Sequence, residues 1–302
     1  MLKIATRKSP LALWQAEFVK SRLQVFYPDL EIELVKMSTQ GDKILNSPLS
    51  KIGGKSLFIK ELEIGILEGR ADIAVHSMKD VPYQLPKEFQ VGAILERENP
   101  FDAFVSNDFD SINELPKGAR VGSCSLRRIV QLKALRPDLS ILDLRGNVNT
   151  RLSKLDEGEY DAIILACSGL IRLGFEGRIK QHLSAEKSLP AVGQGALGIE
   201  IRKGDKEIIS LISSLVHKKT MIEVSAERAF NATLEGGCSV AIGAYATSNN
   251  DELHLKGMVG NVDSGVILRA EEAGDVSEPN ALGELVANKL SSMGAKELLK
   301  EV

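Results

Sequence analysis

The sequence predicts an α/β protein that ends in a smaller α+β domain. Over the first two thirds of its 302 residues, short apolar runs typical of strands alternate with segments of helical periodicity. From about Lys218 the pattern changes to one helix followed by short alternating strands. The length is sufficient for two or three domains, each able to bury a core without disulfides or metals.

The first block begins with a strand over Leu2–Thr6. The pair Ser9-Pro10 predicts the start of a helix, because Ser can cap a helix and Pro suits its first position. Apolar residues at helical spacing continue this helix to Tyr27. The other elements predicted here are a strand at Glu31–Met37, an amphipathic helix at Ser56–Glu68 and a buried strand at Ala71–His76.

A second α/β block lies between Asn99-Pro100 and Leu189-Pro190, which we interpret as crossovers between two domains. Its predicted elements are strands at Ala119–Gly122, Ile141–Leu144 and Asp161–Ala166, and helices from Leu126 to about Leu135, near Thr150–Leu155 and near Leu170. The first block resumes near Ala196–Ile201, so the second block is predicted to be an insertion.

The C-terminal part starts with a helix over Ile222–Leu234 that ends at Gly236-Gly237, a favourable helix stop. The elements predicted after it are strands at Val240–Thr247, Leu253–Val259 and Val266–Ala273, and a helix near Ala281–Leu299. We therefore expect a discontinuous α/β domain of residues 1–98 and 196–216, an inserted α/β domain of residues 99–195, and an α+β domain of residues 217–302.

Composition and charge exclude several classes of protein. The chain has 38 Lys and Arg against 41 Asp and Glu, a net charge of −3, which argues against a nucleic-acid partner. Its three cysteines lie far apart and its four histidines are scattered, so no metal site is predicted. The apolar runs are too short to span a bilayer, and Arg7 and Lys8 interrupt any secretory signal. We expect a cytoplasmic protein.

Cationic side chains follow several of the predicted strands. In open α/β sheets, ligands bind outside the carboxyl ends of the strands. The polar residues found after those strands are Arg7, Ser9, Lys79, Asp80, Ser125, Arg127, Arg128, Arg145, Arg151 and Arg172. Any single arginine among them is better interpreted as a surface charge or a member of an ion pair, and only the whole set favours a ligand. Because arginine holds carboxylates and phosphates bidentately, the set predicts an anionic small molecule in a cleft between two domains.

Two further side chains are candidates for chemistry. Asp80 is either a turn-capping residue before Val81-Pro82 or a carboxylate kept ionised by cations, able to stabilise a developing cation or move a proton. Cys238 lies in a glycine loop and is either a small buried side chain or an accessible thiol. Cys124 and Cys167 are interpreted as structural.

Two glycine-rich segments resemble nucleotide-binding motifs without meeting their requirements. The stretch before Ser56 lacks the leading glycine of a P-loop, since Leu49 occupies that position. We interpret it as a mobile loop that carries Lys51 and Lys55. Residues 193–198 match GxGxxG, but no clear strand precedes them and no acidic residue follows at the required distance. A turn or crossover is the better interpretation.

Several longer motifs together resemble one family. They are IATRKSPLALW at 4–14, ADIAVHSMKDVP at 71–82, LRR at 126–128, LRGN at 144–147, DAIIL at 161–165, LPAVGQGA at 189–196 and LEGGC at 234–238. This combination is similar to the porphobilinogen deaminases, also called hydroxymethylbilane synthases. The resemblance implies a transferase of tetrapyrrole (haem) biosynthesis that joins four porphobilinogen molecules head to tail, releases ammonia each time and yields hydroxymethylbilane.

The resemblance also implies the site and the fold. It places a covalent dipyrromethane cofactor on Cys238 through a thioether and makes Asp80 the catalytic carboxylate. The implied cofactor contacts are Lys79, Asp80, Ser125, Arg127, Arg128 and Arg145, and the implied substrate contacts are Arg7, Ser9, Lys51, Lys55, Arg151 and Arg172. The implied fold has two domains like those of type II periplasmic binding proteins, with a cleft between them, and a third domain that carries the cofactor. The implied protein is a monomer.

Cys124 and Asn149 stand where the family is expected to have a small hydroxyl residue and glycine. Two other functions fit parts of the sequence. A solute-binding protein would hold a carboxylate ligand between two lobes without releasing ammonia. An anion-responsive regulatory domain would bind DNA or a partner, although no helix-turn-helix pattern appears and the net charge is negative.

Overall fold

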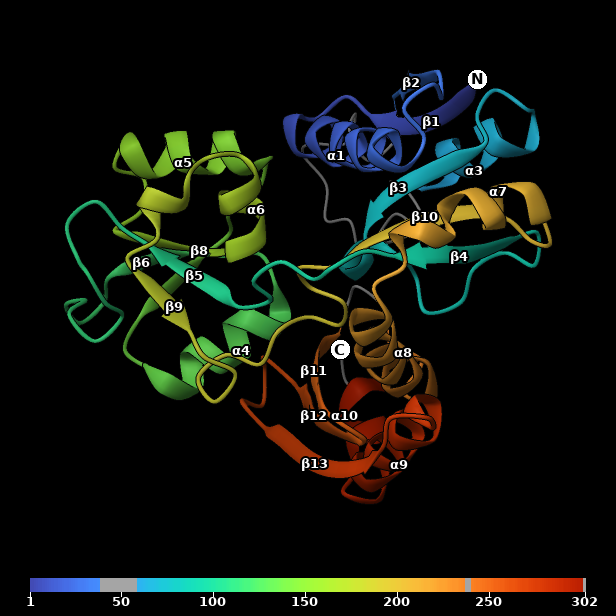
Figure 1. The fold of residues 1–302 in the computed structure, drawn as a ribbon. Coiled ribbons are helices and arrows are strands. Elements are labelled where there is room, and N and C mark those ends of the chain that lie inside the picture. Colours follow the sequence, from blue (N-terminus) through green and yellow to red (C-terminus); the bar gives the residue numbers. More distant parts are fainter. Residues whose placement is uncertain (39–58, 237–239, 301–302) are drawn as a thin grey trace. The chain divides into compact units, whose positions relative to one another are not determined.

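The computed structural model describes residues 1–38, 59–236 and 240–300 (Figure 1). Their contacts divide the chain into two units, Met1–Glu98 with Ala196–Ile222 and Asn99–Gly195 with Glu223–Val302. Helix α8 (Lys218–Thr233) contains the third boundary between the units, after Ile222. The candidate residues Lys51, Lys55 and Cys238 lie outside the described ranges.

Unit 1 is built on a five-stranded mixed sheet of order β2-β1-β3-β10-β4. Strand β1 is parallel to its neighbours β2 and β3, whereas β10 runs antiparallel to both β3 and β4. Its elements are β1 (Leu2–Arg7), α1 (Pro10–Phe26), β2 (Ile32–Met37), α3 (Lys60–Leu67), β3 (Ile73–Ser77), the 3-10 turn η3 (Met78–Asp80), β4 (Phe89–Ile94), β10 (Leu197–Arg202), α7 (Lys206–Ile212) and the 3-10 turn η5 (Ser213–Leu215).

Alternation along the strands of unit 1 gives the sheet two apolar faces. Ile4 and Ile73 belong to one core cluster, which also contains Leu23 of α1. The neighbouring residue Ala5 belongs to a second cluster, which contains Leu62 of α3. Because successive strand residues point to opposite faces, α1 and α3 cover opposite sides of the sheet.

Unit 2 contains a second five-stranded mixed sheet of order β7-β6-β8-β5-β9. Strands β7, β6 and β8 are parallel, and β5 is antiparallel to β8 and β9. The elements of this part are β5 (Asp102–Val105), β6 (Arg120–Gly122), α4 (Leu126–Leu135), β7 (Ser140–Leu142), α5 (Val148–Asp156), β8 (Ala162–Ala166), α6 (Cys167–Arg172), the 3-10 turn η4 (Glu176–Arg178) and β9 (Gln181–Leu183).

The C-terminal part of unit 2 is a three-stranded antiparallel sheet with helices. Its elements are β11 (Ala241–Asn249), β12 (Glu252–Gly260), β13 (Ile267–Asp275), α9 (Pro279–Ser292) and α10 (Ala295–Lys300). Val130 of α4, Leu189 and Met258 of β12 share one apolar cluster, so α4 packs on the three-stranded sheet of the same unit.

The predicted fold class is confirmed: two α/β sheets are followed by a smaller α+β part. Three strands were not predicted, namely β4, β5 and β9. β9 has only three residues, and β5 begins with the charged residue Asp102, so neither gives a clear apolar pattern. The division into three domains stays a prediction. No helix in the described ranges is both long and apolar enough to cross a bilayer.

Candidate active site

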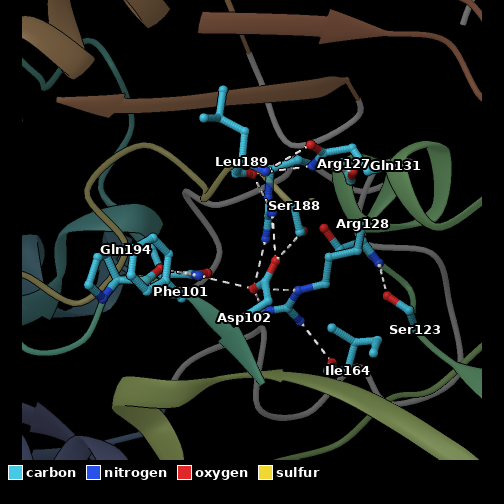
Figure 2. Close-up of polar contacts among 12 residues, drawn as sticks. Phe101, Asp102, Ser123, Arg127, Arg128, Gln131, Ile164, Ser188, Leu189 and Gln194 are labelled. Atoms are coloured by element: carbon cyan, nitrogen blue, oxygen red, sulfur yellow. Dashed lines mark hydrogen bonds and ion pairs between the residues drawn. The ribbon is translucent and has the colours of Figure 1, made fainter. Parts of the chain in front are cut away.

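A buried carboxylate organises the predicted arginine pair of unit 2. Asp102, the first residue of β5, is fully buried. Its Oδ2 accepts hydrogen bonds from Arg127 Nη1 at 2.8 Å and Ser188 Oγ at 2.8 Å. Its Oδ1 accepts from Arg127 Nη2 at 3.1 Å, from Arg128 Nε and Nη2 at 2.9 and 2.8 Å, and from Gln194 Nε2 at 3.0 Å. Figure 2 shows these side chains converging on the carboxylate.

The two guanidinium groups are also held by backbone carbonyls. Arg127 Nη1 donates to Leu189 O at 2.7 Å, and Arg128 Nη1 donates to Ile164 O at 3.0 Å. Burial alone would raise the pKa of Asp102, but the charges and hydrogen bonds of the two arginines hold it well below its usual range. One carboxylate against two guanidinium groups leaves an excess positive charge. An anionic group is therefore electrostatically favoured nearby.

The segment from Ser188 to Gly195 is fastened by the same network. Gln131 Oε1 accepts from Leu189 N at 2.8 Å, and Gly193 N donates to the buried Glu227 at 2.7 Å. Arg172 is buried, and its Nη2 donates to Gly195 O at 2.6 Å. Gly193 and Gly195 have φ angles of 68° and 91°, which favour glycine. The GxGxxG match is thus a turn, as predicted.

The other predicted cations of unit 2 are Arg145, in the connection between β7 and α5, and Arg151, in the first half of α5. Arg145 Nε donates to Asp143 at 2.8 Å, and Arg151 Nε donates to Gly146 O at 2.7 Å. Asn147 caps α5 by accepting a hydrogen bond from the backbone N–H of Thr150 at 2.9 Å. Both arginines therefore have side chains oriented by the loop that follows the strand.

The predicted residues of unit 1 gather at one edge of its sheet. β1 and β3 are parallel neighbours, so their carboxyl ends lie at the same edge. Arg7 ends β1, Ser9 precedes α1, and Lys79 and Asp80 form the 3-10 turn after β3. Asp80 is partly exposed. These residues thus follow the ends of neighbouring strands, and their place in one site stays a prediction.

The cysteines differ in environment. Cys167 is buried, as a structural thiol would be, whereas Cys124 is exposed just ahead of α4 and does not serve as core packing. Ser125 is the N-terminal cap residue of α4, but its side chain makes no capping hydrogen bond. In the part of the chain that the structure describes, no group of three or more metal-binding side chains occurs.

Asp102 was not predicted as part of the site. The adjacent arginines Arg127 and Arg128 could have indicated such a residue, because two buried guanidinium groups need a carboxylate partner. Its identity depends on β5 lying beside β8 in the sheet, which no local pattern indicates.

Two models of protein families match the chain. One described as "Porphobilinogen deaminase, dipyromethane cofactor binding domain" matches residues 2–210, and one described as "Porphobilinogen deaminase, C-terminal domain" matches residues 221–292. The chain belongs to the porphobilinogen deaminase family. Porphobilinogen deaminase of Ruthia magnifica subsp. Calyptogena magnifica is 66% identical over 299 residues, covering 99% of this chain and 98% of that one. Porphobilinogen deaminase of Vesicomyosocius okutanii is 65% identical over 300 residues, covering 99% of each.

The chain is also similar, at a greater distance, to solved structures of other proteins. A substrate-binding protein from Coxiella burnetii has a TM-score of 0.46 and 14% identity, covering 71% of this chain and 92% of its own. The BvgS VFT2 domain of Bordetella pertussis (double mutant) has a TM-score of 0.44 and 16% identity, covering 71% and 85%. The strand orders described above, rather than these likenesses, define the fold of this deaminase-family chain.

Family membership gives the activity predicted from the sequence. The chain is a transferase that makes hydroxymethylbilane from porphobilinogen, in tetrapyrrole biosynthesis, with a dipyrromethane cofactor. A dipyrromethane built from two substrate units carries acetate and propionate groups. The excess positive charge around Arg127 and Arg128 fits such an anionic group.

Proposed function

We propose that Asp80 is the catalytic carboxylate and that the cations at the strand ends hold the carboxylates of cofactor and substrate. The observation that carries this proposal is the placement of Asp80 in a turn at the carboxyl edge of the unit 1 sheet, the same edge at which Arg7 ends β1. In this proposal Cys238 forms the thioether to the dipyrromethane. The other cofactor contacts are Lys79, Ser125, Arg127, Arg128 and Arg145, and the substrate contacts are Arg7, Ser9, Lys51, Lys55, Arg151 and Arg172.

The chemistry explains why a lone carboxylate is required. The aminomethyl group in its protonated, ammonium form loses ammonia when its C–N bond breaks, and the pyrrole ring that remains carries the positive charge. A fixed carboxylate near the pyrrole N–H stabilises this cation and can accept or return a proton. When bound, the cofactor supplies the pyrrole carbon to which the first substrate unit is joined. Each added unit brings two carboxylates, which suits a site rich in arginine and lysine.

The test is ammonia release from porphobilinogen by the Asp80→Asn variant. The carboxamide keeps the shape of the side chain but cannot carry the negative charge. We expect turnover to fall by at least about a hundredfold, within the range found when a catalytic acid–base or electrostatic group is removed. Exposed Asp29→Asn in the same unit is the matched control and should retain wild-type turnover.

Wild-type turnover by Asp80→Asn would reject its catalytic role. Binding of porphobilinogen by the wild-type chain without any ammonia release would favour the solute-binding alternative. Peptide mass mapping tests the anchor independently: a covalent increment of two pyrrole units is expected on Cys238 and on neither Cys124 nor Cys167.

We further propose a cytoplasmic monomer that binds neither nucleic acid nor membrane and is divided into the three predicted domains. The net charge of −3 supports the absence of nucleic-acid binding. Light scattering after gel filtration tests the monomer, and a gel shift at physiological salt tests for nucleic acid.

A further inference from the structure

The connection between β7 and α5 carries Arg145, one of the proposed cofactor contacts. Arg145 Nε donates a hydrogen bond to Asp143 Oδ2 at 2.8 Å within this connection. The two side chains are 36% and 61% exposed, and an ion pair so open to solvent contributes little to holding a side chain in one direction. The direction of Arg145 therefore depends on what holds the backbone at Asp143.

Tyr160, which shortly precedes β8, holds that backbone. Its hydroxyl group donates to the carbonyl oxygen of Asp143 at 2.7 Å, between residues 17 positions apart in the chain. Burial, as the largest cause, raises the pKa of Tyr160. The hydroxyl group therefore keeps its proton and remains a hydrogen-bond donor throughout the neutral range.

The tyrosine ring reaches the end of β7 across a glycine. Strand β6 lies between β7 and β8 in the sheet, and Gly122 is its last residue. A Cβ on Gly122 would lie 2.9 Å from both Tyr160 Cδ1 and Leu144 Cδ2. Tyr160 and Leu144 also share one apolar cluster, in which Tyr160 is only 7% exposed. Packing thus fixes the ring, and the ring fixes the place of its hydroxyl group.

The connection is also fastened on the other side of Arg145. Gly146 has a φ of 111°, which favours glycine, and its carbonyl oxygen accepts a hydrogen bond from Arg151 Nε at 2.7 Å. Arg145 therefore lies between two backbone carbonyls that are held by side chains. Of the two donors, Tyr160 lies beyond the end of α5 and ties the connection to the sheet, whereas Arg151 belongs to α5 itself.

We propose that Tyr160 is a positioning residue for the reaction: acting through Asp143, it directs the Arg145 guanidinium group toward a carboxylate of the dipyrromethane. This inference rests on the proposed function, in which Arg145 is a cofactor contact. Because Asp143 accepts from Nε, it sets the direction in which the two Nη atoms point. A guanidinium group held in this way is suited to bidentate contact with a carboxylate.

The covalent attachment of the cofactor determines which kinetic quantity should change. A group joined to the chain is not lost when one of its contacts weakens, so a misdirected Arg145 changes where the cofactor lies. Misplacement of a reacting group lowers the rate of the chemical step. We therefore expect the effect in kcat rather than in KM for porphobilinogen.

The experiment compares Tyr160→Phe with the wild-type cofactor-loaded enzyme. The variant removes only the hydroxyl oxygen and keeps the ring in its apolar cluster, so the fold is retained. For hydroxymethylbilane formation, kcat should fall about fivefold or more, with KM unchanged within about twofold. Tyr27→Phe, at the end of α1 in unit 1, is the matched control and should behave as the wild type.

Hydrogen exchange in the same holoenzymes gives a readout that does not depend on activity. The reporters are the backbone amides of Thr150 and Arg151, which donate to Asn147 at the start of α5. Both should exchange at least about fivefold faster in Tyr160→Phe, because the connection before them loses its anchor to the sheet. The amides of β12 should be unchanged.

A double-mutant cycle tests whether Tyr160 acts through Arg145. If it does, Tyr160→Phe should cause no further loss of kcat when it is added to Arg145→Gln. A loss of the same size in both backgrounds would reject the proposal, since a general structural effect would not depend on Arg145.

The remaining outcomes separate the possible errors. Faster exchange with an unchanged kcat would reject positioning, because the connection would loosen without consequence for the cofactor. A lower kcat with unchanged exchange would reject the anchoring of the connection by Tyr160. Wild-type kcat in Arg145→Gln alone would instead remove Arg145 from the proposed function, leaving the exchange comparison valid.

Discussion

Arg127 and Arg128 stand in the first turn of α4, where the helix dipole disfavours cations, and Asp102 is what stabilises them there. All three side chains are buried. Because the pKa of Asp102 is held well below its usual range, its stabilising effect is complete above the ordinary carboxyl pKa of 3.8 and is lost only as pH falls below it. The arginine pair is thus stable in position throughout the neutral range.

Asp102→Asn should be among the most destabilising single changes in unit 2. It leaves two buried guanidinium groups without a counter-ion, and breaking a buried pair in this way costs about 3–5 kcal/mol. Asp161→Asn is the matched control, since Asp161 pairs with Arg120 at 2.8 Å in a largely exposed setting and should cost much less. Urea unfolding of each variant measures the difference. Equal losses would mean that burial of the Asp102 network has no energetic consequence.

Sequence analysis at this scale identified which side chains carry charge but not how they pair. Arg127, Arg128 and Asp80 were placed at strand ends because apolar runs mark those ends. Asp102 and the hydrogen bond between Tyr160 and Asp143 were missed, since the partners lie 25 and 17 residues apart along the chain. Such pairs follow from sheet order, which only the assembled fold determines.

At the scale of elements, the helices α8 and α9 approach each other closely in the C-terminal part. A Cβ on Gly283 of α9 would lie 2.4 Å from Ala226 O and 2.7 Å from Ala229 Cβ of α8. Backbone atoms cannot give way as a flexible side chain would. The two helices therefore depend on glycine at this crossing.

Gly283→Ala should lower stability by about 1–3 kcal/mol through this overpacking, despite the better helix propensity of alanine. Gly177→Ala is the control, because a Cβ there meets nothing within 4 Å. Thermal unfolding of both variants measures the contrast. A Gly283→Ala protein as stable as Gly177→Ala would show that the two helices can separate without cost.

Most elements were predicted from the periodicity of apolar residues in the sequence, including α1, α4 and the three strands of the C-terminal sheet. Those elements are long or are bounded by Pro, Ser or Gly. The strands β5 and β9 have four and three residues, too few to show alternation. Their place in the sheet is set by hydrogen bonding to β8 and to each other.

At the scale of the whole molecule, the two five-stranded sheets have equivalent strand orders. In each, three strands are parallel and a fourth, antiparallel strand is supplied where the chain has crossed from the other unit. β5 follows the first crossing and β10 follows the second. After the second crossing the chain returns to unit 1 at Ala196.

The placement of β10 has a consequence for synthesis on the ribosome. The five-stranded sheet of unit 2 has all its strands once residue 183 has emerged, whereas the sheet of unit 1 must wait for residue 202. The usual N-terminal-first order of domain folding is therefore reversed for these sheets. Limited proteolysis of stalled nascent chains of increasing length should find β5–β9 protected before β1–β4. Until β10 emerges, the sheet of unit 1 lacks the strand that pairs with both β3 and β4, and the unpaired edges of those strands are open to chaperones and proteases.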